Sequence, residues 1–541
     1  MCTYVTNVVT KLNIMNKKLI LPLLVGGSIT TQAVDKPNII LIYVDDMGYA
    51  DPACFGGTYT PTPNIDKIAT EGIRFSQYYS ACPISSPSRT GVTTGMYPTR
   101  WGITTFLQNK AGNAKAEQND FLDNRAPSVA RVLKENGYAT GHFGKWHMGG
   151  GRDVDNAPYI TTYGFDEYKS TWESPDPDPQ LTSTDWIWAD SDNVKRWNRT
   201  AYFVDKTLAF LSKNKEKPCY INLWPDDVHT PWVENDDEHS SPDTDWQKAT
   251  AFTTVLKELD VQIGRLMQGI KDLGLDEKTL VIFTSDNGPS PAFSGKRTGN
   301  MRGQKAQLYE GGIRMPLILR WPNHILPNQL NSESVICAVD LMPSFCALTG
   351  ATLPDRFPTD GEDRSSILLG GANTERAKPL FWEFGKTNNN RVSPHIAVRE
   401  GDWKLLVNAD GTRTELYNLR TDVREATNVA SSNATIVNRL KPMAISWFNS
   451  AFRQFADLGT STNNATFDAK FRTFPNPVTD FLQIHTSLQD YRVEILGIDG
   501  KKIITCEQNA AKVDLTNLRQ GIYILSIENN GVKYFKKIIK E

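Results

Sequence analysis

The sequence predicts an α/β fold with a central, mostly parallel sheet, a smaller C-terminal α+β subdomain and a small terminal β-sandwich. Two observations predict the first part: apolar runs of strand length recur between residues 36 and 375, and segments with helical periodicity lie between them. A third observation predicts the rest, because after about residue 376 the strand-like segments become short and closely spaced.

Continuous apolar runs mark the strands of the central sheet. The run over 38–44 is almost uninterrupted, as expected of a strand that is buried on both faces. Pro127 is suited to the first turn of a helix, and Gly137 follows the end of that helical pattern. Further strands are predicted over 220–224, 280–284 and 316–321, and further helices over 201–211 and 253–273. This alternation assigns residues 36–375 to one α/β domain.

Two smaller units are predicted after this domain. The first, over 376–458, is an α+β subdomain with one helix over 438–452. Its short strands are predicted at 395–399, 403–407 and 414–417. The second, over 459–541, begins with a polar linker and continues as an antiparallel sandwich. Its strands are predicted at 481–485, 491–495 and 522–527.

Composition and the N-terminal segment limit the function classes. The 541 residues carry a net charge of −2, so no basic field indicates nucleic-acid binding. The seven cysteines are dispersed, form no C-x-x-C pair and leave room for one disulfide if the chain is exported. Lys17-Lys18, an apolar stretch over 19–25 and small residues to Ala33 predict a secretory signal. We therefore assign residues 1–33 to an upstream start and a signal peptide.

Polar residues follow three of the predicted strands. Asp45-Asp46 follow the first strand, a segment around His229 follows the strand over 220–224, and Asp286-Asn287 follow the strand over 280–284. Ligands of open α/β sheets bind outside the carboxyl ends of the strands. We therefore expect these side chains to meet at one edge of the sheet.

The pattern S-x-P-S-R-x-x-x-x-T-G begins at Ser85 and includes Arg89. A purely structural role is open to these residues, because Pro87 suits the first turn of a helix and Ser86 could cap it. Cys82 does not fit the pattern, since Ile84 rather than proline stands two residues after it.

With this motif the chain resembles the type I formylglycine-dependent sulfatases of the alkaline-phosphatase superfamily, from about residue 36 to residue 429. The other segments that carry the resemblance, in family order, are Asp45-Asp46, Gly144-Lys145-Trp146-His147, Asp286-Asn287-Gly288 and Gly303-Gln304-Lys305 with the stretch over 309–314. The resemblance implies an alkaline-phosphatase-like sandwich. It also implies that Ser85 is oxidised to formylglycine, whose hydrated aldehyde is the nucleophile.

The resemblance implies one calcium ion. Its implied ligands are Asp45, Asp46, Asp286, Asn287 and an oxygen of modified Ser85. Carboxylate and amide oxygens form a hard site that suits calcium rather than zinc. Each Asp alone is more often a cap or turn residue, but clustered carboxylates without a cation would repel one another.

The resemblance also implies roles for the cationic residues. Arg89 and Lys145 would orient the aldehyde hydrate and offset negative charge, and His147 would be the base that promotes release of sulfate. His229 and Lys305 would bind sulfate and help to protonate the leaving alcohol. The residues before His229, from Asp226 to Val228, differ from the small and aromatic residues common at this place in the family.

The expected substrate is a sulfate ester of a sulfated oligo- or polysaccharide. Arg100, Asp227 and Arg297 are weak candidates for contacts with the sugar. The stretch over 172–197 is rich in Trp and Asp, which suits binding to sugars. It is equally well explained as an insertion with a small core of its own.

The terminal sandwich resembles the C-terminal sorting domain of type IX secretion in Bacteroidetes, through its F-P-N-P opening at 474–477, its Gly521-Ile522-Tyr523 and its basic end. A carbohydrate-binding or spacer sandwich is the alternative. The resemblance implies the type IX machinery as a partner and the cell surface or medium as the destination. The serine at position 85 implies a radical-type maturase as a second partner.

Two other functions stay open at this point. One is a phosphomonoesterase or phosphodiesterase of the same superfamily with an unmodified nucleophile and zinc, which would want additional His ligands. The other is a catalytically silent glycan-binding protein, which would have lost some of the catalytic positions.

Overall fold

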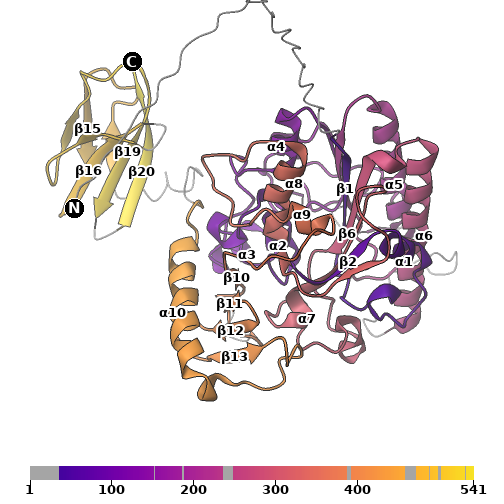
Figure 1. The fold of residues 1–541 in the computed structure, drawn as a ribbon. Helices are drawn as coiled ribbons and strands as arrows, with labels where there is room; N and C mark the ends of the chain where they lie inside the picture. The colour runs from indigo at the N-terminus through magenta and orange to yellow at the C-terminus, as the bar shows by residue number, and fades with distance from the viewer. Residues whose placement is uncertain are drawn as a thin grey trace, which may run out of the picture. The chain divides into compact units, whose positions relative to one another are not determined.

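A mixed β-sheet lies at the centre of the computed structural model (Figure 1). The structure describes residues 36–541 except 152, 185–187, 190, 235–247, 387–390, 457–470, 487, 498–500 and 530–531. The predicted signal peptide and the predicted linker lie outside the described residues. Among the helices of the described part of the chain, none has the length and hydropathy needed to cross a bilayer.

The strand order of the central sheet is β4-β3-β5-β1-β6-β7-β2-β8, with β9 beside β2. Strands β3, β4, β5, β1 and β6 pair in parallel, whereas β7 runs antiparallel to both β6 and β2. The prediction of a mostly parallel sheet is therefore confirmed. The bounds are β1 Asn38–Val44, β2 Ile73–Tyr79, β3 Ala139–Gly144, β4 Glu167–Ser170, β5 Cys219–Trp224, β6 Thr279–Ser285, β7 Arg314–Arg320, β8 Gln329–Asn331 and β9 Ile336–Cys337.

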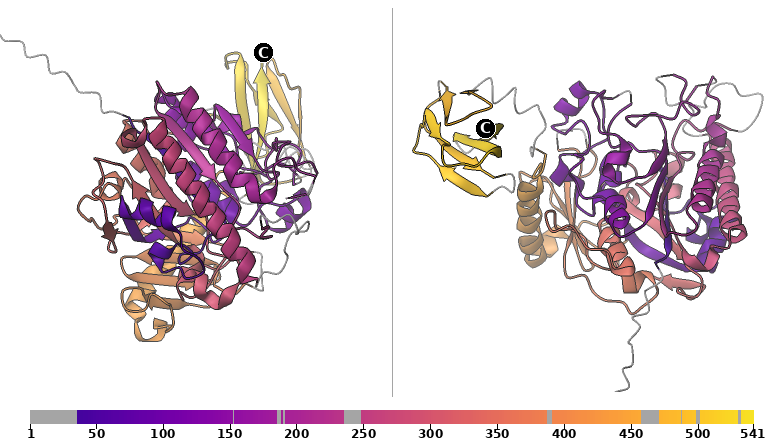
Figure 2. Two further views of the ribbon diagram at one scale, coloured as in Figure 1. Left: turned by 90° about the vertical axis from the view of Figure 1, so that its right-hand side faces the viewer. Right: turned by 90° about the horizontal axis from the view of Figure 1, so that it is seen from above.

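Helices cover both faces of this sheet, because successive side chains of β1 enter two different cores. Ile39, Leu41 and Tyr43 belong to one core, and Ile40 and Ile42 belong to the other. The face of Ile40 is covered by α1 (Pro63–Thr70), α5 (Arg199–Lys213) and α6 (Ala249–Asp272), as the left view of Figure 2 shows. The opposite face is covered by α2 (Ser85–Thr94), α4 (Val129–Glu135) and α8 (Leu341–Thr349). Three short helices complete the domain: α3 (Lys110–Lys115), α7 (Glu310–Ile313) and α9 (Ser365–Leu368).

A four-stranded antiparallel sheet and one helix form the predicted α+β subdomain. The elements are β10 (Leu380–Glu383), β11 (Ile396–Glu400), β12 (Trp403–Val407), β13 (Glu415–Asn418) and α10 (Ala434–Ala451). Its core is continuous with one core of the central sheet, and the Trp382 indole donates a hydrogen bond to the Ser80 carbonyl over 2.8 Å. The boundary at residue 375 stays a prediction.

The last segment has two small antiparallel sheets around a core of its own. One sheet contains β14 (Arg472–Phe474), β15 (Phe481–His485) and β18 (Lys512–Asp514). The other contains β16 (Tyr491–Leu496), β17 (Lys502–Thr505), β19 (Gly521–Asn529) and β20 (Val532–Lys540). This arrangement agrees with the predicted antiparallel unit.

Candidate active site

The polar ends of β1, β5 and β6 meet, as their order in the sheet predicts. Strand β1 lies between β5 and β6, so the segments that follow these strands are neighbours. The Asp45 amide donates to the Pro225 carbonyl over 3.0 Å, and the Asp46 amide donates to Asp286 Oδ1 over 3.0 Å. Three segments that are far apart in the sequence thus form one site.

Ser85 reaches this site from the first position of α2. Its side chain is 2% exposed, and its Oγ donates to Asp45 Oδ1 over 3.1 Å and lies 3.5 Å from Asn287 Oδ1. Ile84, not Ser86, is the N-cap, because Ser86 Oγ instead accepts a hydrogen bond from the Leu107 amide over 2.9 Å. The capping alternative for Ser86 is therefore wrong, and Ser85 faces the carboxylates.

Three carboxylates and one amide gather around Ser85, and all four side chains are fully buried: Asp45, Asp46, Asp286 and Asn287. The Asn287 amide Nδ2 donates to Asp46 Oδ1 over 2.7 Å. Burial, followed by the charge of Asp45, raises the pKa of Asp286. Buried oxygens that repel one another in this way need positive charge, and their chemistry fits a hard divalent cation such as calcium.

Each carboxylate also has a cationic side chain beside it. Arg89 Nη2 lies 2.8 Å from Asp286 Oδ2, Lys145 Nζ lies 2.8 Å from Asp45 Oδ2, and Lys305 Nζ lies 2.7 Å from Asp46 Oδ2. Although burial acts in the opposite direction, Lys145 and the other cations hold the pKa of Asp45 well below its usual range. The site can therefore attract an anion such as a sulfate group.

His147 is the least satisfied polar group of the site. It is 7% exposed, and neither ring nitrogen has a hydrogen-bond partner among the described residues. Burial, and then the charge of Lys145, lower the pKa of His147 to about 3. A neutral imidazole with both nitrogens free is suited to accept a proton from a bound group.

His229 lies on the other side of the site, beside Lys305. Its Nδ1 is 2.5 Å from the Thr230 carbonyl, so this nitrogen carries the hydrogen and Nε2 is the free acceptor. Lys305 Nζ lies 3.2 Å from Nε2. Burial and the charge of Lys305 lower the pKa of His229.

Asp45, Asp46 and His229 form a group whose candidate metal-ligand atoms lie within 4.8 Å of one another. The sequence interpretation assigned His229 to sulfate binding instead. The Lys305 ammonium contacts both His229 Nε2 and Asp46 Oδ2, and a cation at that place opposes a second positive charge. Because Asp46 belongs to both ligand sets, this contact acts on both of them, and the all-oxygen set stays a prediction.

The three weak substrate candidates have partners within the protein. Arg297 is buried and binds Asp51 over 2.7 Å, and Arg100 binds Asp360 over 2.7 Å. Asp227 accepts a hydrogen bond from the Thr200 hydroxyl, and burial followed by Asp226 raises its pKa to about 7. A role in sugar binding stays a prediction for Arg100, Asp227 and Arg297.

Two contacts to the site were missed by sequence reasoning. Ser290 Oγ donates to Asp46 Oδ2 over 2.9 Å, and Glu173 Oε1 lies 3.4 Å from Lys145 Nζ. Ser290 could have been found, because it lies two residues beyond the D-N-G segment. Glu173 belongs to a loop without any motif, so no sequence pattern predicted its contact with Lys145.

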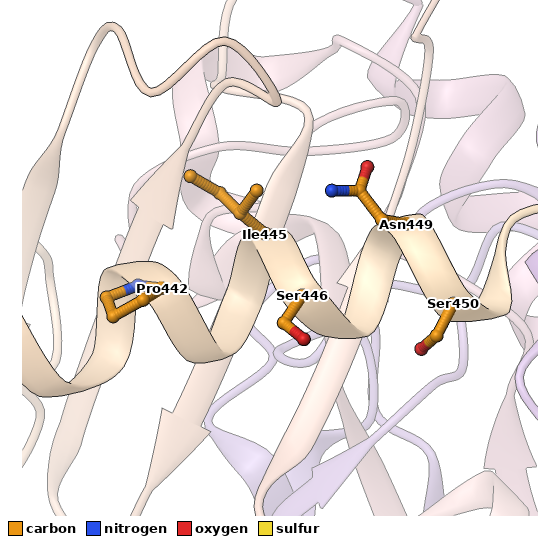
Figure 3. A pocket seen from close by; sticks show the side chains of 5 residues that line it. All are labelled: Pro442, Ile445, Ser446, Asn449 and Ser450. Atoms are coloured by element: carbon orange, nitrogen blue, oxygen red, sulfur yellow. The ribbon is translucent and has the colours of Figure 1, made fainter.

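A separate hollow lies on α10 and is lined by Pro442, Ile445, Ser446, Asn449 and Ser450 (Figure 3). None of the residues that surround Ser85 lines this hollow. This hollow is therefore distinct from the candidate active site.

Comparison with known proteins identifies this arrangement. Residues 37–351 match the family model described as Sulfatase, and residues 303–444 match the model of the N-sulphoglucosamine sulphohydrolase C-terminal region. The chain belongs to the sulfatase family. This sulfatase is thus a sulfuric ester hydrolase. Its residues 472–541 match the secretion system C-terminal sorting domain, which implies export.

Curated relatives agree with the family assignment. The sulfatase is 28% identical to N-acetylgalactosamine-6-O-sulfatase of Bacteroides thetaiotaomicron, over 79% of this chain and 98% of that protein. It is 31% identical to human arylsulfatase A, over 68% of this chain and 74% of that protein.

Solved structures share the fold. A sulfatase structure from work on glycosaminoglycan metabolism by Bacteroides thetaiotaomicron has a TM-score of 0.62 and 26% identity, and covers 77% of this chain and 100% of its own. The structure of Ps i-CgsB in complex with k-i-k-neocarrahexaose also has a TM-score of 0.62 and 26% identity, and covers 80% and 97% of the two chains.

Proposed function

We propose that this sulfatase hydrolyses a sulfate ester of a sulfated glycan, with a formylglycine made from Ser85 as nucleophile and one calcium ion as cofactor. The observation that carries the proposal is the position of Ser85 Oγ, 3.1 Å from Asp45 Oδ1 inside a buried cluster of carboxylates and cations. The glycan substrate is supported by the relative named N-acetylgalactosamine-6-O-sulfatase and by the neighbour bound to k-i-k-neocarrahexaose.

Asp45, Asp46, Asp286 and Asn287 would hold the calcium ion, together with an oxygen of the modified Ser85. When bound, calcium supplies a positive charge that polarises the sulfate group and the hydrated aldehyde. The formylglycine hydrate supplies one hydroxyl for attack on sulfur and a second from which a proton is removed when sulfate leaves. An unmodified serine offers only the first.

The side chains around this centre bind the sulfate group and move protons. Arg89 and Lys145 orient the hydrate and offset negative charge, because both are held against the carboxylates. His147 accepts a proton when sulfate is released, as its two free nitrogens and neutral state allow. His229 and Lys305 bind sulfate and help to protonate the leaving sugar oxygen: the Lys305 ammonium carries the proton, and His229 Nε2 accepts a hydrogen bond from Nζ over 3.2 Å and positions it.

The proposal extends to maturation and export. A radical-type maturase would oxidise Ser85, and the type IX secretion machinery would recognise the sorting domain in a Bacteroidetes-type bacterium, after a signal peptide has directed export. The match of residues 472–541 to a secretion sorting domain supports the second partner.

Mass spectrometry of the peptide that contains Ser85, purified from native cells, tests the proposal. We expect the loss of two hydrogens at Ser85, and an unmodified serine in an active preparation would contradict the proposal. Ser85→Ala should abolish sulfate release without unfolding the protein, and activity near that of wild type would equally contradict it. A host without the maturase should yield folded, inactive protein.

The alternatives have less support. A zinc-dependent phosphoesterase would need His ligands beside the Asp pairs. Among the described residues His229 is the histidine grouped with Asp45 and Asp46, and its Nε2 is hydrogen-bonded to the Lys305 ammonium. A silent glycan-binding protein would have lost catalytic positions, yet Ser85, Lys145 and His147 are all present.

A further inference from the structure

Arg196 lies outside every motif of the sequence and contacts the segment that carries His229. It is the first residue of a short helical turn over Arg196–Asn198 that leads into α5. Its side chain is 2% exposed. Its Nη1 forms an ion pair with the Asp226 carboxylate, and its Nη2 donates to the Asp226 carbonyl over 2.7 Å and to the His229 carbonyl over 3.0 Å.

These contacts fix both ends of one turn. The His229 amide donates to the Asp226 carbonyl over 3.2 Å, so residues 226–229 form a turn whose two terminal carbonyls bind the same guanidinium. The imidazole is in turn anchored to the backbone through Nδ1 and the Thr230 carbonyl. The position of Nε2 therefore depends on the backbone that Arg196 holds.

A structural ion pair alone does not explain Arg196, because the same carboxylate has a second arginine. Arg199 Nη1 donates to Asp226 Oδ2 over 3.0 Å, and its Nη2 donates to the Leu181 carbonyl over 3.1 Å. Burial raises the pKa of Asp226, but Arg196 and Arg199 outweigh it and hold that pKa below its usual value. Both arginines neutralise Asp226, whereas the contacts to the carbonyls of the turn belong to Arg196.

We infer that Arg196 is a positioning residue that holds His229 Nε2 where the leaving oxygen of the substrate is protonated. The inference rests on the proposed role of His229. It also gives a function to the Trp- and Asp-rich segment over 172–197, because Arg196 of this segment binds the carbonyls of the turn over 226–229. A shift of about 1 Å in a group that must meet a reacting atom lowers the rate by up to about 100-fold.

A double-mutant cycle tests the inference with any substrate that the mature wild-type enzyme hydrolyses. We would measure sulfate release from chondroitin sulfate, carrageenan and 4-nitrophenyl sulfate by wild type, Arg196→Met, His229→Ala and the double variant. Arg196→Met should lower kcat about 10- to 100-fold and change KM little. In the His229→Ala background the same substitution should lower kcat less than about twofold.

The choice of leaving group gives a second measurement. A sugar alcohol is a poor leaving group that needs a proton, whereas 4-nitrophenolate leaves without one. The loss caused by Arg196→Met should therefore be larger for a glycan sulfate than for 4-nitrophenyl sulfate wherever wild type hydrolyses both.

Arg199→Met is the matched control, since it removes a partner of the same carboxylate. Its effect on thermal unfolding should resemble that of Arg196→Met, but its effect on kcat should be the same with and without His229. An equal loss for Arg196→Met in both backgrounds would overturn the inference. If His229→Ala itself left kcat unchanged, the proposed role of His229 would fail instead.

Discussion

Two buried clusters of charged residues differ in which of their polar groups lack a partner. At the junction of the central sheet with the α+β subdomain, Lys404 Nζ lies 2.9 Å from both Glu310 Oε1 and Glu425 Oε1. The Tyr79 hydroxyl donates to Glu310 Oε2 over 2.6 Å, and the Glu310 amide donates to Glu425 Oε2 over 2.6 Å. In this cluster one ammonium lies between two carboxylates, and each carboxylate also accepts a hydrogen bond from a neighbouring group.

In the active site each carboxylate has a cation beside it, but a neutral imidazole is left without hydrogen-bond partners among the described residues. Asp45, Asp46 and Asp286 lie together, and both nitrogens of His147 have no partner among the described residues. The junction stabilises the fold with its charges, whereas the site holds charges ready for a cation and an anionic substrate. Unsatisfied buried groups are expected where function, not stability, determines the sequence.

The largest stability effect should come from the junction. Lys404→Met removes the ammonium that both carboxylates share and, among the described residues, leaves only Glu310 with an ion-pair partner, Arg314, so we expect the free energy of unfolding to fall by about 3–5 kcal/mol. Urea unfolding would measure it. Lys386→Met is the control, because Lys386 binds the exposed Glu117 and should change stability by less than about 1 kcal/mol. Equal effects of the two substitutions would contradict the comparison.

Calcium should stabilise the folded protein by binding to the carboxylates of the active site, whereas the junction requires no metal ion. At about 100 times its Kd, calcium should raise the free energy of unfolding by about 2.7 kcal/mol, and a chelator should reverse the effect. Thermal unfolding with calcium chloride or EDTA would measure it. The comparison would break if the unfolding temperature of wild type did not respond to calcium.

A buried carboxyl group outside both clusters gives a third case. Burial raises the pKa of Glu383 to about 8, and its Oε2 has no hydrogen-bond partner among the described residues. The folded state then favours the neutral form of this carboxyl group. Its contribution to the free energy of unfolding therefore falls as pH rises from the unfolded pKa of about 4.5 toward 8. Relative to wild type, Glu383→Gln should gain at most about 1.4 kcal/mol for each pH unit in this window. The free energies of unfolding of wild type and Glu383→Gln would be measured at pH 5 and pH 8. The same difference between the two proteins at both pH values would contradict the prediction.

The smallest effect should come from a ligand position in the absence of metal. Asp286→Asn removes one of three carboxylates that repel one another, but also a partner of Arg89, which keeps Asp45 at 3.4 Å. Because these two effects oppose each other, stability in EDTA should change by less than about 1 kcal/mol. The same variant should lose the stabilisation by calcium and the activity. A loss of several kcal/mol in EDTA would show that Asp286 supports the fold as Lys404 does.

Local patterns predicted the strands and much of the site, because the polar pairs directly follow apolar runs. Asp45, Asp286 and the segment of His229 converge for that reason alone. Details of chain direction were harder to predict: β7 begins at Arg314, two residues before the expected start, and runs antiparallel to its neighbours. Pro316 is tolerated there because the β2–β7 pairing is irregular at this position. No hydrogen bond from the N–H that proline lacks is therefore needed between the two strands.

Long-range partners could not be predicted from the same patterns. Lys404 lies 94 residues from Glu310, and Arg196 lies 30 residues before Asp226 in a segment without a motif. Such pairs form only after the chain has folded, and a single sequence carries no local periodicity that links them. The chemistry of each side chain could therefore be read from the sequence, but the residue that it contacts in the fold could not.

The burial of helix α2 has a consequence for the order of events in the cell. All ten residues of α2 are buried, and Ser85 lies at its first position. If Ser85 is oxidised as proposed, the oxidising enzyme cannot reach it in the folded protein, so the modification would have to precede folding. Synthesis proceeds from the N-terminus, which would give such an enzyme access to Ser85 while the sorting domain is still being made. A molecule that folded before this modification would then stay inactive.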